Sequence, residues 1–377
     1  MPSERVANVK PFLVMDVLAR AKELERAGHD VVHFELGEPD FATPIEIKDA
    51  AAEALKSDDT HYTSARGKYE LVEGIVDFYR TRYGVDLQQQ QVVVSSGTSP
   101  VLMMAFLAMA DPGDEIIIPR PHYPCYPNFA RLTGATPVFV DSSPASGFLV
   151  DPDDIRKAMT PRTKAVILNS PGNPTGAVMD GERLRAIGEL GPLVVSDEIY
   201  HGLVYEGEEH SILEYTENAF VVNGFSKVFS MTGWRLGYAV VPPEYVRTLE
   251  ILQQNIFISA NSFSQWGGLQ ALCNPRVRSE TEVMRKSYNE RRLAMLKGLR
   301  ELGFEVPVDP KGAFYILADA RRFDGDSIRL SQRILEEAHV AVTPGDDFGI
   351  PGFLRFSYTT GMDQIEEGLR RMQKVLS

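Results

Sequence analysis

The sequence is poor in cysteine and contains no long uninterrupted run of apolar residues. Cys125 and Cys273, its two cysteines, lie far apart in the chain, so neither a disulfide framework nor a C-x-x-C metal or redox motif is present. We expect both to be small buried side chains. The longest apolar run, Val101–Ala110, has 10 residues and is too short to span a membrane. The N-terminus lacks the apolar core of a signal peptide, so we expect a cytoplasmic protein.

Positive charge is also scarce. The chain has 39 Lys and Arg against 52 Asp and Glu, a formal net charge of -13, and no basic run, which argues against a nucleic-acid partner. A small anionic substrate needs only a local positive site and is not excluded. The sequence has no G-x-G-x-x-G, Walker A or G-x-S-x-G motif. His29 and His33 are four residues apart without further ligands, so we expect no metal site.

What the sequence does contain is a series of short apolar runs separated by helix-like stretches. This alternation predicts an α/β fold with a mostly parallel central sheet covered by helices on both faces. The predicted strands are Val92–Val94, Glu115–Ile118, Pro137–Val140, Ala165–Leu168, Leu193–Val195, Phe220–Val222 and Gly237–Val241. Predicted helices between them include 98–110, 123–133, 151–159 and 180–190.

The pattern changes in the last hundred residues. A long amphipathic helix is predicted over 276–302, with Gly303 as its stop. Short strands near 304–306, 313–318 and 352–357 and helices near 326–338 and 361–374 follow. We therefore predict a large domain over 45–279 and a smaller α+β domain over 280–377. The segment 1–44, with a helix at about 13–27, is expected to pack with the small domain.

One lysine stands in an unusual setting. Lys227 follows a predicted strand and lies among Phe225, Val228 and Phe229. Burial lowers the pKa of an amine, and a neutral amine is the nucleophile that condenses with a carbonyl. Ser226 and Arg235 on either side are suited to grip a phosphate.

Three further loops follow predicted strands, where ligands bind in open α/β sheets. Asp197 either pairs with a cationic ring nitrogen or caps the next helix. Asn173, in a loop rich in Pro, Gly and Asn, either presents its amide to a ligand or belongs to a simple turn. The small-residue loop Ser95–Ser99 precedes a helix and either binds a phosphate or only starts that helix.

A single arginine interrupts the apolar strand near the C-terminus. Arg355 lies between Leu354 and Phe356. A buried guanidinium needs a carboxylate partner, which is either a substrate carboxylate or a structural salt bridge.

Together and in this order, these segments resemble the class I fold-type I pyridoxal-phosphate (PLP) aminotransferases, a family that includes bacterial aspartate aminotransferases. The resemblance runs from about Pro11 to the C-terminus. It rests on several modest motifs in register: Gly37–Phe41, His61–Thr63, Pro121–Tyr126, Asn173–Gly176, Ser196–Tyr200, Ser226–Lys227 and Trp234–Gly237.

The resemblance implies a role for each motif. Lys227 holds PLP as a Schiff base and shuttles a proton, Asp197 pairs with the pyridine nitrogen, and Tyr200 and Asn173 contact the ring hydroxyl oxygen. Tyr123 stacks on the ring. The phosphate contacts are Gly97, Thr98, Ser99, Ser226 and Arg235. Arg355 holds the substrate carboxylate with help from Asn173 and the backbone at Gly37. Tyr62 reaches the phosphate of the neighbouring subunit, so a homodimer is expected.

Two positions depart from relatives specific for acidic substrates. Those relatives often carry lysine at the position of Ser99 and a hydroxyl residue near Val14. We therefore expect an aminotransferase acting on neutral or apolar L-amino acids, with a 2-oxo acid such as 2-oxoglutarate as acceptor. Two alternatives are a PLP-dependent C–S lyase of the same fold and a non-catalytic PLP-binding regulator or scaffold.

Overall fold

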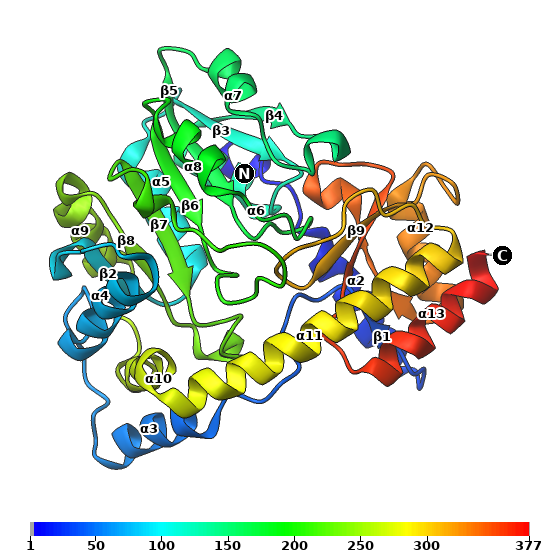
Figure 1. Ribbon diagram of the computed structural model, residues 1–377, viewed down its shortest axis with the longest axis horizontal. Helices are drawn as coiled ribbons and strands as arrows, with labels where there is room; N and C mark the ends of the chain where they lie inside the picture. The colour runs from blue at the N-terminus through cyan, green and yellow to red at the C-terminus, as the bar shows by residue number, and fades with distance from the viewer. Residues whose placement is uncertain (1–3, 377) are drawn as a thin grey trace.

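The computed structural model describes residues 4–376 and is built around a seven-stranded sheet (Figure 1). All its strands run parallel except β8, which is antiparallel to both neighbours, β2 and β7. The strands, in their order across the sheet, are β2 (Val92–Ser95), β8 (Gly237–Val240), β7 (Ala219–Gly224), β6 (Leu193–Asp197), β5 (Thr163–Asn169), β3 (Glu115–Arg120) and β4 (Thr136–Asp141). The predicted α/β fold with a mostly parallel sheet is confirmed.

Alternating side chains of each strand enter cores on opposite faces of the sheet. Val92 and Val94 point into one core and Val93 into the other, which is why both faces of the strand are apolar. One face is covered by α5 (Thr98–Met109), α6 (Cys125–Thr133) and α9 (Val246–Ile256). The other is covered by α3 (Ile45–Lys56), α4 (Tyr69–Tyr83), α7 (Pro152–Ala158), α8 (Gly181–Gly188) and α10 (Ser262–Cys273).

A 28-residue helix, α11 (Pro275–Leu302), joins this sheet to the C-terminal part of the chain (Figure 1). Its start is fixed by Asn274, whose side chain accepts a hydrogen bond from the backbone N–H of Arg276, and by Pro275 in the first turn. It ends at Gly303, which has φ 97°. The predicted domain boundary at 279/280 falls inside this continuous helix.

The N- and C-terminal segments form two small sheets. Strand β1 (Val32–His33) pairs in parallel with β10 (Val340–Ala341), although more than 300 residues separate them. The other sheet is antiparallel, with β12 (Phe353–Ser357) between β11 (Thr343–Pro344) and β9 (Tyr315–Asp319). Around them lie α1 (Glu4–Ala7), α2 (Leu13–Arg26), α12 (Ser327–Arg333), the π-helical turn Ile334–Ala338 and α13 (Met362–Leu376).

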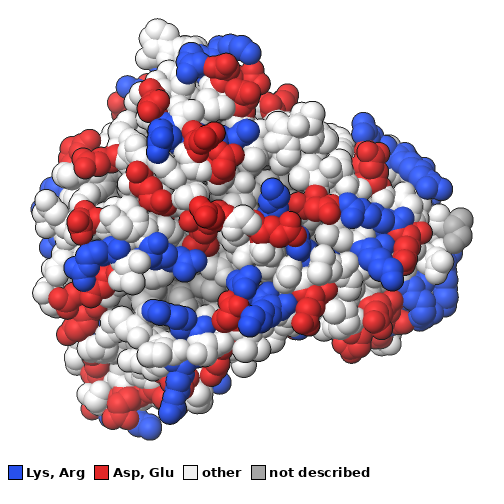
Figure 2. All heavy atoms as spheres, viewed as in Figure 1, with Lys and Arg blue, Asp and Glu red and all other residues white. Residues whose placement is uncertain are grey.

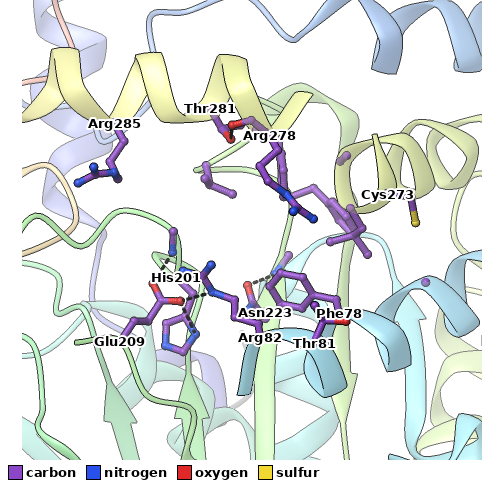
Figure 3. Close-up of a pocket in the computed structure, with 18 of the residues that line it drawn as sticks. Phe78, Thr81, Arg82, His201, Glu209, Asn223, Cys273, Arg278, Thr281 and Arg285 are labelled. Carbon is purple, nitrogen blue, oxygen red and sulfur yellow. Dashed lines mark hydrogen bonds and ion pairs between the residues drawn. The ribbon is translucent and has the colours of Figure 1, made fainter. Parts of the chain in front are cut away.

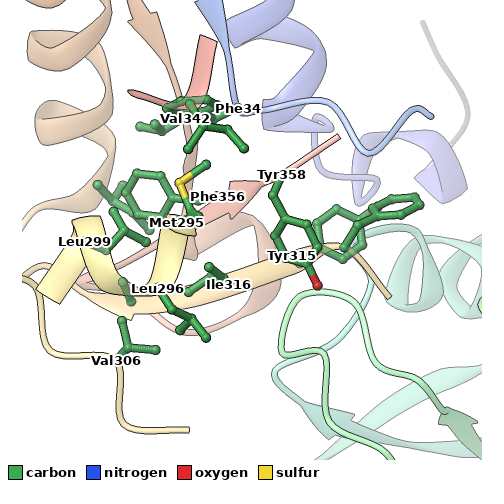
Figure 4. Close-up of a cluster of buried hydrophobic side chains, with 14 of the residues drawn as sticks. Phe34, Met295, Leu296, Leu299, Val306, Tyr315, Ile316, Val342, Phe356 and Tyr358 are labelled. Atoms are coloured by element: carbon green, nitrogen blue, oxygen red, sulfur yellow. The ribbon is translucent and has the colours of Figure 1, made fainter. Parts of the chain in front are cut away.

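These sheets share one core with α11. Leu299 of α11, Phe34 from the N-terminal segment and Phe356 of β12 are all fully buried in it (Figure 4). The N-terminal segment thus packs with the C-terminal part, as the predicted fold required. The boundaries 1–44, 45–279 and 280–377 stay a prediction, and residues 1–3 and 377 lie outside the described part.

Two details of the sequence analysis are wrong. The stretch 304–306 is not a regular strand, because only an isolated bridge joins Glu305 to Asp319. The cysteines are not both buried: Cys273, the last residue of α10, is exposed, and Cys125 is partly buried.

On the face of the molecule shown in Figure 2, acidic and basic side chains are interspersed. Among the described residues, no helix is long and apolar enough to cross a membrane.

Candidate active site

The carboxyl ends of three adjacent strands bring the predicted loops together. Asn169 ends β5, Asp197 ends β6, and Gly224 ends β7 just before the lysine segment. The side-chain amide of Asn169 donates to the Asp197 carbonyl (2.9 Å), and its oxygen accepts the backbone N–H of Asn173 (2.7 Å). The strand order thus places Asn173, Asp197 and Lys227 around one crevice.

Lys227 meets the N-terminal segment at this crevice. Its Nζ donates a hydrogen bond to the Gly37 carbonyl (2.8 Å), 190 residues away in the chain. Desolvation by burial lowers the pKa of Lys227 to about 8, although the nearby Glu38 carboxylate opposes the shift. An amine with this pKa is substantially neutral, and therefore nucleophilic, in mildly alkaline solution.

Asp197 is a buried acid aimed into the same crevice. Burial raises its pKa to about 6, while hydrogen bonds from Tyr126 and from the backbone of Ile199 act in the opposite direction. The Tyr126 hydroxyl donates to Oδ2 (2.7 Å) and the Ile199 N–H to Oδ1 (3.2 Å). A turn rather than a helix follows Asp197, so it is not a helix cap. A cationic partner would stabilise this carboxylate in its ionised form.

Arg355 is buried without a carboxylate partner. It is 3% exposed and forms no ion pair within residues 4–376. Its Nη1 donates to Asn173 Oδ1 (3.0 Å), and its Nη2 donates to Thr343 Oγ1 (3.1 Å) and to the Glu35 carbonyl. Its Nε has no hydrogen-bond partner. Of the two alternatives for Arg355, the structural salt bridge is therefore absent among residues 4–376, and the guanidinium retains the capacity to bind an anion.

Two aromatic rings hold Arg355 in place, and sequence reasoning missed both. Its guanidinium lies 4.5 Å from the ring centre of Tyr315 and 4.8 Å from that of Phe348. The Tyr315 hydroxyl also hydrogen-bonds to that of Tyr200 (2.8 Å). A Cβ at Gly37 would lie 1.7 Å from the Tyr315 hydroxyl oxygen, so only glycine allows this approach. Tyr126 belongs to the motif Pro121–Tyr126, but nothing in the sequence indicates its contact with Asp197.

A cradle suited to an anion lies where α5 begins. Gly97, with φ 99°, precedes the helix, and no side chain caps the N–H groups of its first turn. The guanidinium of Arg235 lies close to this glycine: a Cβ at position 97 would be 2.5 Å from Arg235 Nη2. Thr98 and Ser99 form the first turn of α5. Ser226 is buried in the lysine segment.

The remaining predicted residues separate into two groups. The Tyr123 ring meets Phe12 edge-on (5.8 Å between centres) and also Tyr126 (5.3 Å), forming an aromatic wall. Val14, two residues after Phe12, is buried, and its N–H donates to Asp347 (3.3 Å). Tyr62, in contrast, is 80% exposed and takes no part in the site within this chain.

Each group of the site matches one group of PLP or of an amino acid. The amine of lowered pKa matches the aldehyde of PLP, the buried acid its ring nitrogen and the anion cradle its phosphate. The unpaired guanidinium matches the carboxylate of an amino acid. The fold and the site thus define a PLP-dependent enzyme of fold type I.

Comparison with known proteins agrees with this class. Residues 29–372 match the family model for aminotransferase class I and II. A (5-formylfuran-3-yl)methyl phosphate transaminase from Methanocaldococcus jannaschii is 41% identical, with 100% of each chain covered. An aspartate/prephenate aminotransferase from Thermus thermophilus is 40% identical, over 99% of this chain and 98% of the relative.

Solved structures give the same result. The aspartate aminotransferase from Thermus thermophilus with maleate superposes with a TM-score of 0.97 at 40% identity, over 100% of both chains. A Methanococcus jannaschii structure, described as similar in its active site to kynurenine aminotransferases, has a TM-score of 0.93 at 40% identity over 100% of both chains. The chain belongs to the aminotransferase class I and II family and is a PLP-dependent aminotransferase.

Replacing Asp197 by Asn should stabilise the cofactor-free protein in a pH-dependent way. The folded chain holds the Asp197 proton with a pKa of about 6 against an ordinary value of 3.8. Wild-type stability therefore falls relative to the variant as the pH rises from about 4 to 6, and the difference then stays constant at no more than about 3 kcal/mol. Asp347, whose pKa burial also raises to about 6, is present in both proteins and cancels. Urea unfolding of both apoproteins at pH 4, 5, 6 and 8 measures this; a variant less stable at pH 8 would contradict it.

Proposed function

We propose that this aminotransferase moves the amino group of a neutral or apolar L-amino acid to a 2-oxo acid such as 2-oxoglutarate. The observation that carries the proposal is that Lys227 and Arg355 lie in the same crevice. Lys227 has a pKa of about 8 and Arg355 has no carboxylate partner among residues 4–376. The first is suited to the carbonyl chemistry and proton transfer of amino exchange, and the second to the carboxylate that every amino acid carries.

The cofactor would be held by groups from several elements. Asp197, already hydrogen-bonded by Tyr126, would pair with the ring nitrogen. Tyr200 and Asn173 would contact the ring hydroxyl oxygen, and Tyr123 would stack on the ring. The phosphate would lie at the start of α5, against Gly97, Thr98, Ser99, Ser226 and Arg235. When bound, PLP supplies an electron-withdrawing ring that stabilises negative charge at the substrate Cα.

The chain's own residues would orient the substrate and move its proton. Arg355, positioned by Tyr315 and Asn173, would bind the α-carboxylate, with the Gly37 backbone beside it. The Nζ of Lys227, once free, would remove the proton from the substrate Cα–H as a general base and would deliver it to the cofactor carbon that had been the aldehyde carbon. The hydrogen bond between Tyr200 and Tyr315 would fix the Tyr200 hydroxyl.

The entrance supports neutral or apolar side chains. Phe12 packs on Tyr123, Val14 is buried behind it, and position 99 on α5 is serine. None of these supplies a cation for a side-chain carboxylate, whereas an aromatic wall favours an apolar body. The relatives point both ways, since they include aspartate aminotransferases and a structure described as similar in its active site to kynurenine aminotransferases.

The covalent role of Lys227 predicts a single labelled peptide. Borohydride reduction of the holoenzyme should fix the cofactor to the peptide that contains Lys227, detected by mass spectrometry. Lys227→Ala should lose the adduct and reduce turnover by roughly 10²–10⁴-fold or more. Lys286→Ala, a change at an exposed lysine, is the matched control and should retain both. An adduct on any other peptide would defeat the proposal.

The substrate preference predicts a ranking. Phenylalanine and leucine should complete the first half-reaction, followed by absorbance of the holoenzyme, at a kcat/KM roughly tenfold or more above that of aspartate. A strong preference for aspartate would contradict the neutral or apolar substrate class. Release of pyruvate and ammonia from cysteine conjugates without any acceptor would instead favour the C–S lyase alternative.

The exposure of Tyr62 supports a homodimer in which this side chain completes the partner's phosphate site. Sedimentation should give about twice the chain mass of 41.9 kDa. Tyr62→Phe should weaken cofactor binding roughly tenfold, the effect of one lost hydrogen bond to a charged group. The control Tyr69→Phe changes another exposed tyrosine and should bind the cofactor normally. A monomer that retains its cofactor tightly would exclude this role.

A further inference from the structure

A second cavity lies behind the lysine segment. Its volume is about 950 Å³, it is open to solvent on one side, and it is lined by α4, the end of α10, the start of α11 and the loop 201–209 (Figure 3). None of the residues assigned above to the cofactor or substrate lines it. Its size lies within the range of pockets that bind small organic molecules.

The floor of the cavity is apolar and largely aromatic. Phe225 and Phe229 come from the lysine segment, with ring centres 5.9 Å apart, and Phe78 comes from α4. Val228 and Leu272 extend the same surface. An aromatic or branched apolar group would gain contact area here without displacing any hydrogen-bonded side chain.

The cavity's carboxylates already have cationic partners. Glu209 accepts hydrogen bonds from Arg82 (2.8 Å) and from the Tyr83 hydroxyl (2.8 Å). Its interactions with the neighbouring cations outweigh its desolvation and lower its pKa to about 2. Glu282 is paired with Arg285 (2.8 Å), and Asp77 with Arg80 (2.6 Å). The cavity therefore offers little to a cationic ligand.

One cation in the lining is left over. The side chain of Arg278, an exposed residue, forms no ion pair or hydrogen bond with the described residues, whereas the other two lining arginines are in ion pairs. Its backbone N–H and carbonyl are hydrogen-bonded to Asn274 and Thr281. Figure 3 shows its side chain pointing from α11 into the cavity, toward Asn223 and Phe78. Since the remaining charges cancel in pairs, the cavity presents one unpaired guanidinium above an aromatic floor. The fork of N–H donors of a guanidinium matches a carboxylate.

We propose that this cavity is a second ligand site, which binds an organic anion with one carboxylate on Arg278 and an aromatic body against the partly exposed rings of Phe78 and Phe229. The occupant is held apart from the substrate by the segment that carries Lys227. Residues 225, 228 and 229 of this segment line the cavity, while Lys227 reaches Gly37 on the substrate side. Occupancy is therefore transmitted to the amine; this part of the proposal rests on the proposed function.

A cysteine in the lining gives a local test of binding. Cys273 is exposed, lines the cavity and lies close enough to Arg278 for that charge to influence the pKa of its thiol. The holoenzyme is treated with iodoacetamide, with and without 3-phenylpropionate, and alkylation of the Cys273 peptide is followed by mass spectrometry. At ten times its dissociation constant the probe should slow alkylation roughly tenfold, because only the unoccupied fraction reacts.

Matched variants identify the site. Arg278→Gln should abolish the protection. Arg276→Gln should retain it, because Arg276 lies on the same helix but outside the cavity. Arg355→Gln weakens carboxylate binding at the substrate site and should also leave the protection intact. The uncharged 3-phenylpropionamide should protect less. Absence of protection in wild type, or equal protection in folded Arg278→Gln, overturns the proposal.

A second readout tests the coupling separately. Arg355→Gln serves as the background, because the probe then binds only weakly at the substrate site. In this background the pH midpoint of the absorbance change of the lysine-bound cofactor should shift when 3-phenylpropionate is added, and the shift should be lost when Arg278→Gln is combined with it. Protection of Cys273 without any shift would support the site and overturn the coupling. If the protein carries no lysine-bound cofactor, the proposed function fails, and the alkylation rates still decide whether the cavity binds the anion.

Discussion

The structure depends on the partial removal of one amine from water. Lys227 stands at the end of β7, and its neighbours exclude solvent well enough to lower its pKa to about 8. A buried amine requires an acceptor, which is the Gly37 carbonyl of the N-terminal segment. That segment can present this carbonyl only because β1 pairs with β10 and Phe34 is buried against α11. The chemistry at one atom therefore depends on contacts between the two ends of the chain.

Arg355 is a second buried basic group, but it keeps its charge. Its donors reach Asn173 in the loop after β5, Thr343 on β11 and the Glu35 carbonyl, so three distant parts of the chain converge on one guanidinium. Neutral acceptors and aromatic rings hold it, yet none removes its charge. A buried cation without a counter-ion is costly, typically by several kcal/mol. Such a site is less stable than the same fold with a structural salt bridge and is correspondingly ready for an anionic ligand.

The sequence predicted all seven strands of the large sheet because residues such as Val92–Val94 are apolar on both faces. Strands β1, β10 and β11 were missed because each has only two residues, which is too short to show a periodic pattern. The candidate loops were found because each follows a strand, but Tyr315 and Tyr126 were not given roles. Their significance lies in contacts with Tyr200, Arg355 and Asp197 that only the tertiary structure creates. The exposure of Cys273 likewise depends on where α10 ends, not on its local sequence.

The side chains of the lysine segment face two different compartments. Ser226 and Lys227 belong to the crevice at the strand ends, whereas Phe225, Val228 and Phe229 belong to the cavity behind it. The residues on either side of Ser226 and Lys227 in the sequence thus line a pocket behind the crevice. Because close-packed side chains transmit small displacements, anything that fills the pocket changes the packing that sets the pKa of Lys227. The lysine segment must be apolar to lower the pKa of Lys227. The same apolar residues therefore also provide a surface through which a bound molecule can change that pKa.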